Sequence, residues 1–299
     1  MEVVKLTKGL DVNILFQDMI KNYQREFGKG VGKYIQNKLD IIQFGEIPAY
    51  LLKNGDEIVG YFEYEKVAEN KVCFYVLYVT KRYRKKEVVQ YFVKHTLLKL
   101  QEEGINHFVA HINPLSTLPL EVSLTGCGFK KYLRNEMSIK LRDFNPTLNL
   151  EVYPFDVKYL DKLKSLMILV FKDTIDSQIY SEFFTLKGQE GVLKRIFTGF
   201  YGRFLANNSL ILVEQGEVIG YALVTAKDCH TAFLMDFGIH PRFQGKGYGK
   251  NLLYYLSNSL RKENYKYLNL AVTEENTRAY NLYKKFGFSI VGEFTIYML

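Results

Sequence analysis

The spacing of apolar residues in the second half of the chain changes from one segment to the next. Residues 156–171 show helical spacing with one apolar face, which predicts an amphipathic helix. Alternating runs at 209–214 and 218–225 flank Gln215-Gly216 and predict a hairpin. The pattern also predicts strands at 150–153, 232–239, 267–272 and 289–297, and helices at 178–197, 250–262 and 277–285. This order is typical of an α/β (α+β type) domain, with a mixed, mainly antiparallel sheet flanked by helices.

The same pattern occurs twice along the chain. Gly60 and Gly220, each between an apolar pair and a tyrosine, are 160 positions apart, and the Gly-Phe pairs at 128 and 287 are 159 apart. A unit of this length is far longer than a solenoid repeat. We therefore expect two domains of one fold, residues 1–146 and 147–299, divided at the turn-rich stretch 143–147.

Composition agrees with two globular domains. The chain has 299 residues, of which 47% are hydrophobic and 24% charged, and domains average roughly 150 residues. The formal net charge of +8 suits a nucleotide cofactor or acidic substrates as well as nucleic acid. Because no nucleic-acid recognition motif accompanies the charge, nucleic acid is the disfavoured partner.

The cysteines and the N-terminus point to the cytoplasm. Cys73, Cys127 and Cys229 are far apart in the sequence, and we expect buried, reduced thiols rather than disulfides or a metal site. The first residues lack a basic segment followed by an apolar run, so no signal peptide is expected. No apolar stretch approaches the roughly 18 residues that span a bilayer, so we expect no membrane association.

A glycine-rich loop at 242–249 separates the predicted strand 232–239 from the helix that follows. Glycine lets the backbone approach an anion closely, and the amides of such a loop, with the helix N-terminus, attract phosphate. The loop lacks the Gly-Lys-Ser/Thr ending of a P-loop, and the repeated parallel units of a dinucleotide-binding fold are not evident. The loop alone therefore predicts only a phosphate-bearing ligand.

A second motif narrows this prediction. Residues 276–288 read Asn-x-x-Ala-x-x-Leu-Tyr-x-x-x-Gly-Phe, in which Asn276 can cap a helix and Gly287 can end it. Together with Gln-x-x-Gly-x-Gly at 244–249, in this order and at this separation, the motif resembles the GNAT superfamily of N-acetyltransferases. The resemblance is strong over 150–299 and weak over 1–149, which implies tandem GNAT folds.

This resemblance implies acetyl-CoA as the acetyl donor and co-substrate, with no metal. Backbone amides of the loop would hold the pyrophosphate, with charge added by Arg242 and Lys246, and the strand edge at 237–239 would pair with the pantetheine arm. The implied cofactor-binding residues are Phe237, Gly238, Ile239, Arg242, Gln244, Gly245, Lys246, Gly247, Tyr248, Gly249 and Asn276.

Two catalytic residues follow from the same resemblance, which implies direct attack by an amine in a ternary complex. Tyr283 matches the tyrosine that protonates the departing thiolate, and Asp236 is the candidate base. The glutamate frequent in the family falls one place earlier, at Met235, which leaves Glu274 and Glu275 as other carboxylates. Each assignment has a structural alternative, namely core packing for Tyr283, a sheet hydrogen bond for Asp236 and a helix cap for Asn276.

The first copy departs from the motifs. Lys85, Glu87 and Val89 stand where the second copy has the loop glycines, and Leu124 stands at the position of Tyr283. Side chains at the loop positions would obstruct an anion, so we predict that the first domain is a degenerate, non-catalytic copy. The acceptor stays open between a small amine, an amino sugar and a peptide N-terminus. The alternative function is a non-catalytic acyl-CoA sensor or partner-binding module, and homodimer formation stays open too.

Overall fold

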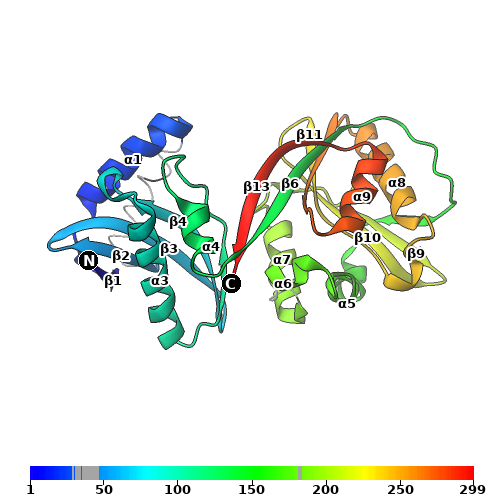
Figure 1. Cartoon of the computed structure of the whole chain (residues 1–299). Coiled ribbons are helices and arrows are strands. Elements are labelled where there is room, and N and C mark those ends of the chain that lie inside the picture. Colours follow the sequence, from blue (N-terminus) through cyan, green and yellow to red (C-terminus); the bar gives the residue numbers. More distant parts are fainter. Residues whose placement is uncertain (29, 31–34, 36–46, 181–183) are drawn as a thin grey trace. The chain divides into compact units, whose positions relative to one another are not determined.

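The computed structural model describes residues 1–28, 30, 35, 47–180 and 184–299. The chain forms two compact units, one of Met1–Tyr132 with Thr295–Leu299 and one of Leu133–Phe294. Each unit is a mixed α/β structure with helices on a mainly antiparallel sheet (Figure 1). No helix within the described ranges is long and apolar enough to cross a membrane.

The strands and helices that the apolar pattern predicts for the second repeat are present, with a break in the predicted helix 178–197. The sheet of the second unit has the order β6-β12-β11-β10-β9-β7, with the short β8 on β10. The strands are β6 (Lys130–Lys140), β7 (Glu151–Pro154), β8 (Arg203–Phe204), β9 (Leu210–Glu214), β10 (Glu217–Ala226), β11 (Thr231–Ile239), β12 (Tyr267–Thr273) and β13 (Ser289–Met298). The helices are α5 (Leu160–Phe171), α6 (Ile175–Ile179), α7 (Leu186–Phe197), α8 (Tyr248–Lys262) and α9 (Thr277–Phe286).

Local sequence explains the key junctions of this unit. The β9–β10 turn has positive φ at Gln215 (49°) and Gly216 (78°), as a two-residue hairpin turn requires. Asn276 caps α9, and Gly287 ends it with a φ of 113°. One apolar cluster packs α8 and α9 against the sheet, and another packs α5 and α7 against β9 and β10. The strand β11 therefore lies between two cores.

The first unit repeats this plan with the sheet order β1-β2-β3-β4-β5-β13. Its strands are β1 (Glu2–Lys5), β2 (Ala49–Asn54), β3 (Glu57–Ala68), β4 (Lys71–Val79) and β5 (His107–Ala110), and its helices include α1 (Asn13–Phe27), α3 (Lys86–Glu102) and α4 (Leu120–Thr125). The parallel pair β4·β5 corresponds to the parallel pair β11·β12 of the second unit. The fold class predicted from the sequence is confirmed.

The last strands of the two repeats change places. By sequence β6 ends the first repeat and β13 ends the second, yet β6 pairs with β12, and Tyr297 and Met298 of β13 pair with Ala110 and Val109 of β5. The compact units consequently divide between Tyr132 and Leu133, whereas the sequence pattern places the boundary at 146/147. The difference arises because apolar alternation marks a strand without specifying its partner.

The exchanged strand predicts a test of stability. Tyr297 is 4% exposed and packs in the core of the first unit. We expect Tyr297→Ala to lower the free energy of unfolding by about 3 kcal/mol or more, as for other buried aromatic residues. Chemical unfolding followed by circular dichroism measures the change, with Val291→Ala, on the same strand and 60% exposed, as the control. Equal midpoints for the two variants would show that β13 adds little to this core.

Two sequence-based expectations need correction. The helical region 178–197 is interrupted, with α6 ending at Ile179 and α7 beginning at Leu186, and residues 181–183 lie outside the described ranges. The three cysteines are free, but only Cys73 is buried, while Cys127 is half-buried and Cys229 is exposed. Cys229 is exposed because it lies in the bend between β10 and β11 rather than in either strand.

Candidate active site

The candidate site of the second unit begins where β11 and β12 separate. Their parallel pairing covers only Thr231–Leu234 of β11, whereas β12 stays paired with β6 as far as Thr273. Within the described residues, β11 therefore has no strand partner on its β12 side from Met235 to Ile239. This open edge includes Phe237, Gly238 and Ile239, the residues expected to meet the pantetheine arm.

A β-bulge sets the direction of Asp236. Leu223 of β10 pairs with Asp236 and Val224 pairs with Leu234, so Met235 is an extra residue on β11. Bulges bend a strand and redirect its side chains, and they are common beside active sites. The residue after the bulge is the carboxylate that was predicted as the base, while Met235 packs with the α5–α7 core.

Asp236 lies in surroundings that favour its neutral form. Burial raises the pKa of Asp236 to about 7, and the negative charge of Asp176 adds to this rise. Hydrogen bonds from the Tyr221 hydroxyl, at 3.1 Å from Oδ1, and from the Phe237 amide act in the opposite direction. The Asp236 side chain keeps partial exposure, so it can exchange protons with a ligand near neutral pH.

Tyr283 of α9 lies in the same region. Its ring packs edge-on against Phe237 and Phe288, with centroid distances of 6.2 and 5.6 Å. Burial, followed by the negative charge of Asp236, raises the pKa of Tyr283 above its usual range, so the hydroxyl is protonated at neutral pH. Among the described residues, no hydrogen-bond partner of this hydroxyl is found. It is therefore a proton donor still available to a ligand.

Gly238 is explained by Tyr221 on the neighbouring strand. A Cβ atom at Gly238 would lie 2.6 Å from the Tyr221 ring and 2.9 Å from its hydroxyl oxygen, closer than atoms can approach. The ring is fully buried, so it cannot move aside cheaply. The missing side chain at Gly238 leaves room for the Tyr221 ring to lie over β11, so that its hydroxyl can reach Asp236. The sequence did not reveal this role of the glycine.

The glycine loop follows β11 through a short 3₁₀ turn, Pro241–Phe243. Gly245 and Gly247 have φ values of 76° and 88°, and α8 begins at Tyr248. Among the described residues, the amides of 245–247 donate to no other backbone group. Free amides, left-handed glycines and a helix N-terminus fit the phosphates of a nucleotide-bearing thioester.

Side chains of the loop hold it in place. Gln244 donates from Nε2 to the Ile239 carbonyl at 2.8 Å, and its Oε1 accepts a hydrogen bond from Arg278. The Tyr248 hydroxyl donates to Glu214 at 2.7 Å, so what Tyr248 offers an anion is its amide. Arg242 and Lys246 are exposed and can add positive charge around the loop.

Asn276 points toward a polar cluster that sequence reasoning missed. Its Oδ1 accepts from the Ala279 amide at 3.4 Å, and its Nδ2 donates to Asp176 at 2.9 Å. The buried Asp176 also accepts from Thr273 at 2.7 Å and from Arg134 at 3.3 Å. The side chain of Asn276 thus serves α9 and Asp176, and its contact with a cofactor stays a prediction.

Arg134 joins this cluster from the exchanged strand β6. It donates to the Tyr180 hydroxyl at 3.1 Å and to the Ala271 carbonyl at 3.3 Å, and its guanidinium lies over the Phe294 ring. The sequence did not predict the pairing of Arg134 with Asp176, for two reasons. Arg134 precedes the boundary drawn from the sequence, and Asp176 lies in a region without a motif. Only the exchange of strands brings them together.

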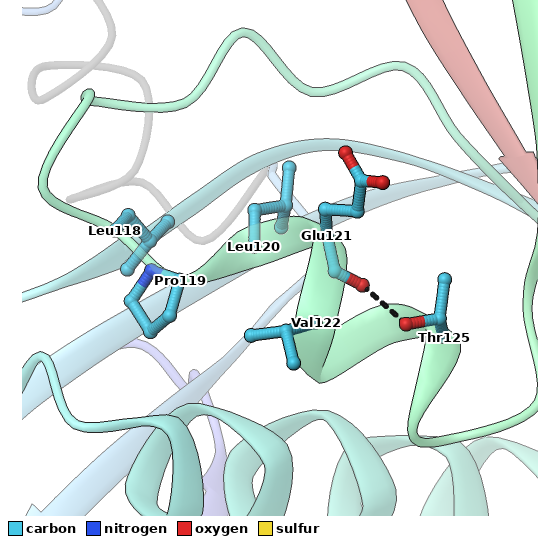
Figure 2. Close-up of a pocket in the computed structure, with 6 residues that line it drawn as sticks. All are labelled: Leu118, Pro119, Leu120, Glu121, Val122 and Thr125. Atoms are coloured by element: carbon cyan, nitrogen blue, oxygen red, sulfur yellow. Dashed lines mark hydrogen bonds between the residues drawn. The ribbon is translucent and has the colours of Figure 1, made fainter.

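Other polar or hollow features of the described residues do not form a comparable site. Glu274 and Glu275 are exposed, and no group of three or more metal-ligating side chains was found in the described ranges. A cavity of about 460 Å³ in the first unit is lined by residues of α4 and the turn before it (Figure 2). Its carboxylate, Glu121, pairs with Lys131 at 2.7 Å, which leaves the cavity without chemistry of its own.

Comparison with known proteins finds a family match in the second half of the chain. Residues 177–288 match the model of the acetyltransferase (GNAT) family. The chain is 33% identical over 103 residues to the uncharacterized N-acetyltransferase YycN of Bacillus subtilis, covering 32% of this chain and 65% of that protein. It is 37% identical over 87 residues to the [ribosomal protein bS18]-alanine N-acetyltransferase of Haemophilus influenzae, covering 28% and 56%. The chain thus spans less than two thirds of either relative.

Solved structures resemble the whole chain. A GCN5-related N-acetyltransferase from Sphaerobacter thermophilus has a TM-score of 0.65 at 14% identity, over 99% of this chain and 95% of that one. A tandem GNAT protein from the clavulanic acid biosynthesis pathway has a TM-score of 0.55 at 12% identity, over 100% and 98%. At such identity these likenesses concern the fold alone. The family match, together with the geometry of β11, the loop and α9, therefore identifies a GNAT-family acetyltransferase domain at residues 177–288, within a chain whose fold resembles that of GNAT proteins.

Proposed function

We propose that the second unit transfers the acetyl group of acetyl-CoA to a primary amine by direct attack in a ternary complex. The observation that carries the proposal is that Tyr283, whose ring packs against Phe237, lies within electrostatic reach of Asp236 beside the open edge of β11. One group has a pKa of about 7 and is partly exposed, and the other is protonated without a partner among the described residues. A base and an acid of this kind are what acyl transfer to an amine needs.

The steps follow from these two groups. Asp236 accepts a proton from the incoming ammonium group, directly or through water, and frees the nitrogen lone pair to attack the thioester carbonyl carbon. A new C–N bond forms while negative charge grows on the carbonyl oxygen, where amides of the open β11 edge can stabilise it. As the C–S bond breaks, Tyr283 donates its proton to the departing sulfur, and the remaining extra proton on the nitrogen passes, directly or through water, to the Tyr283 oxygen, which restores the tyrosine. The bound donor supplies the activated acetyl group.

The glycine loop would hold the pyrophosphate of the donor. The amides of Gly245, Lys246 and Gly247 and the first turn of α8 are the binding groups, and Arg242 adds charge. The start of α8 lies against β11 and α9 at Gly249, where a Cβ would make ordinary contacts with Leu282 at 3.4 Å, Ile239 at 3.6 Å and Phe237 at 3.7 Å. This packing keeps the loop and the catalytic strand edge in a fixed relation.

We propose that the first unit is non-catalytic, and its local structure supports this. The first repeat has Val76 at the position of Asp236 and Tyr78 at that of Gly238. The Tyr78 hydroxyl donates to Asp18 at 2.6 Å. Helix α3 begins at Lys86 directly after an extended Lys85, whereas α8 begins after the two left-handed glycines. Among the described residues of this unit, no carboxylate stands at the strand position of Asp236, although the buried Glu63 on the neighbouring strand accepts from Tyr61 at 2.8 Å, and no pair of left-handed glycines precedes α3.

The connection between β5 and α4 strengthens this proposal. It spans residues 111–119, against three residues between β12 and α9. Arg84 donates to Thr117 at 2.7 Å, Ser116 donates to Glu26 at 2.6 Å, and Leu115 is buried in a core that includes Tyr78. This longer connection packs with Tyr78 and Arg84, which stand at the positions of Gly238 and Gln244 in the second repeat. A pantetheine arm bound at the equivalent place would have to displace it.

The acceptor class is to be found by a screen of amines. We include small amines, amino sugars and peptides, because one relative is named for acetylating an alanine of a ribosomal protein. Release of CoA from acetyl-CoA, followed with a thiol reagent, measures turnover, and a protein sample without amine measures background hydrolysis. Binding of CoA without release on a broad panel would favour the acyl-CoA sensor or partner-binding module instead.

A further inference from the structure

The chain segment 142–150, named here the strap, runs along α8 of the second unit. Side chains on one face of α8 bind its backbone at successive turns. The Ser257 hydroxyl donates to the Arg142 carbonyl at 2.8 Å, Asn258 binds both the amide and the carbonyl of Phe144 at 2.9 and 2.8 Å, and the Tyr255 hydroxyl donates to the Leu148 carbonyl at 3.3 Å. The segment expected to be a boundary between domains is thus part of the second unit.

Asn251 fastens the strap at the end next to the glycine loop. It is 1% exposed, and its Oδ1 accepts from the amides of Thr147 at 2.7 Å and Leu148 at 3.0 Å. Its Nδ2 donates to the Gly247 carbonyl at 3.1 Å, and its own amide donates to the same carbonyl at 3.1 Å. One buried side chain therefore joins the strap, α8 and the last glycine before the helix.

Two hydrogen bonds to the Gly247 carbonyl, one from the side chain and one from the amide of Asn251, fix the orientation of the peptide that joins Gly247 to Tyr248. A peptide is planar and trans, so its C=O and N–H point in opposite directions. Because Asn251 holds the carbonyl toward α8, the Tyr248 amide must point away from the helix, out of its N-terminus. Gly247 reaches this conformation with a φ of 88°, which a residue with a side chain rarely adopts.

We propose that Asn251 is a positioning residue for the glycine loop, and that it aims the Tyr248 amide at the pyrophosphate of the bound donor. The proposal rests on acyl-CoA binding by the second unit. The first repeat agrees with it, because the corresponding residue is Tyr91, whose hydroxyl donates to the Met1 carbonyl at 2.9 Å. The repeat without a glycine loop thus also lacks the asparagine.

Three substitutions distinguish the role of the Asn251 acceptor, Oδ1, from that of its donor, Nδ2. Asn251→Ala removes both, whereas Asn251→Ser restores a donor, because a helical serine can bond the carbonyl four residues earlier. Asn251→Asp keeps the acceptor for the strap amides and removes the Nδ2 donor, which binds both the Gly247 carbonyl and the Thr147 hydroxyl, each at 3.1 Å. We expect CoA, titrated by calorimetry into the full chain, to bind about tenfold more weakly to the Ala and Asp variants, a change of about 1.4 kcal/mol, and near the wild-type Kd to the Ser variant.

Stability and affinity should therefore move separately. The Ser variant should unfold at a lower temperature, because the Thr147 and Leu148 amides lose their acceptor, while it still binds CoA. Asn258→Ala is the matched control, since it loosens the strap at Phe144, about two helical turns beyond Asn251 and farther from the loop. It should lower the unfolding temperature without changing the Kd. Because the Asp variant also adds a negative charge, the Ala and Ser pair decides the question, and does so even where Asp does not fold.

The outcomes are distinct. Wild-type protein that binds no CoA would overturn the proposed function itself. Wild-type protein that binds CoA, together with an Ala variant of equal affinity, would overturn the positioning role of Asn251 alone. A Ser variant as weak as Ala, or an Asn258→Ala variant that also loses affinity, would show that the strap acts through general stability rather than through the Gly247 carbonyl.

Discussion

Asp236→Asn is expected to lower turnover by roughly a hundredfold to ten-thousandfold, the usual contribution of a positioned general base. Asn keeps the shape of Asp and an oxygen that can accept from Tyr221, but it cannot take a proton from the ammonium group of the acceptor. The measurement is CoA release with the best amine from the screen. Affinity for CoA should change little, because Asp236 lies away from the glycine loop in the sheet.

The same substitution should have a signature in pH. A base with a pKa of about 7 makes the wild-type rate rise through pH 7 and level off above it, whereas the residual rate of Asp236→Asn should lack this step. If the rate of the variant still rises through pH 7 as in the wild type, another group is the base, such as an ordered water or the acceptor itself. Glu274→Gln, at an exposed carboxylate, is the control.

Stability should change in the opposite direction to activity. Since folding raises the pKa of Asp236 to about 7, above its value in the unfolded chain, the wild type loses stability as the pH rises from about 4 to 7 and keeps that loss above pH 7. A difference of one between the folded and unfolded pKa values corresponds to about 1.4 kcal/mol. Asp236→Asn has no carboxyl to ionise at this position, so thermal unfolding at pH 8 should occur at a higher temperature in the variant than in the wild type.

The elements of this fold could be predicted because their determinants are local. Gln215-Gly216 specifies the hairpin turn, Asn276 and Gly287 bound α9, and the glycines mark the loop before α8. The motifs also placed Asp236 on the strand before the loop and Tyr283 on the helix that follows β12. Their catalytic roles stay predictions.

What the sequence left undetermined depends on contacts between distant segments. The alternation in residues 136–141 marks a strand equally well whichever repeat it joins, so the exchange of β6 and β13 was not predictable from it. Arg134, assigned to the first domain, therefore did not suggest a partner for Asp176. Gly238 was attributed to a cofactor contact, although the ring of Tyr221 already requires it. Asn251 belongs to no motif in the sequence, because its partners Thr147 and Leu148 lie more than a hundred positions away along the chain.

Tyr283→Phe is expected to lower turnover by about a hundredfold or more, as for the loss of a general acid, with CoA affinity little changed. The tyrosine is 7% exposed, and its ring contacts with Phe237 and Phe288 remain available to phenylalanine. No described residue accepts from its hydroxyl, so the substitution leaves no buried partner unsatisfied and should not lower stability. A loss of rate can then be assigned to the missing proton rather than to misfolding. A Phe variant with the wild-type rate would instead show that Tyr283 serves only as a core aromatic, and that the departing sulfur takes its proton from solvent.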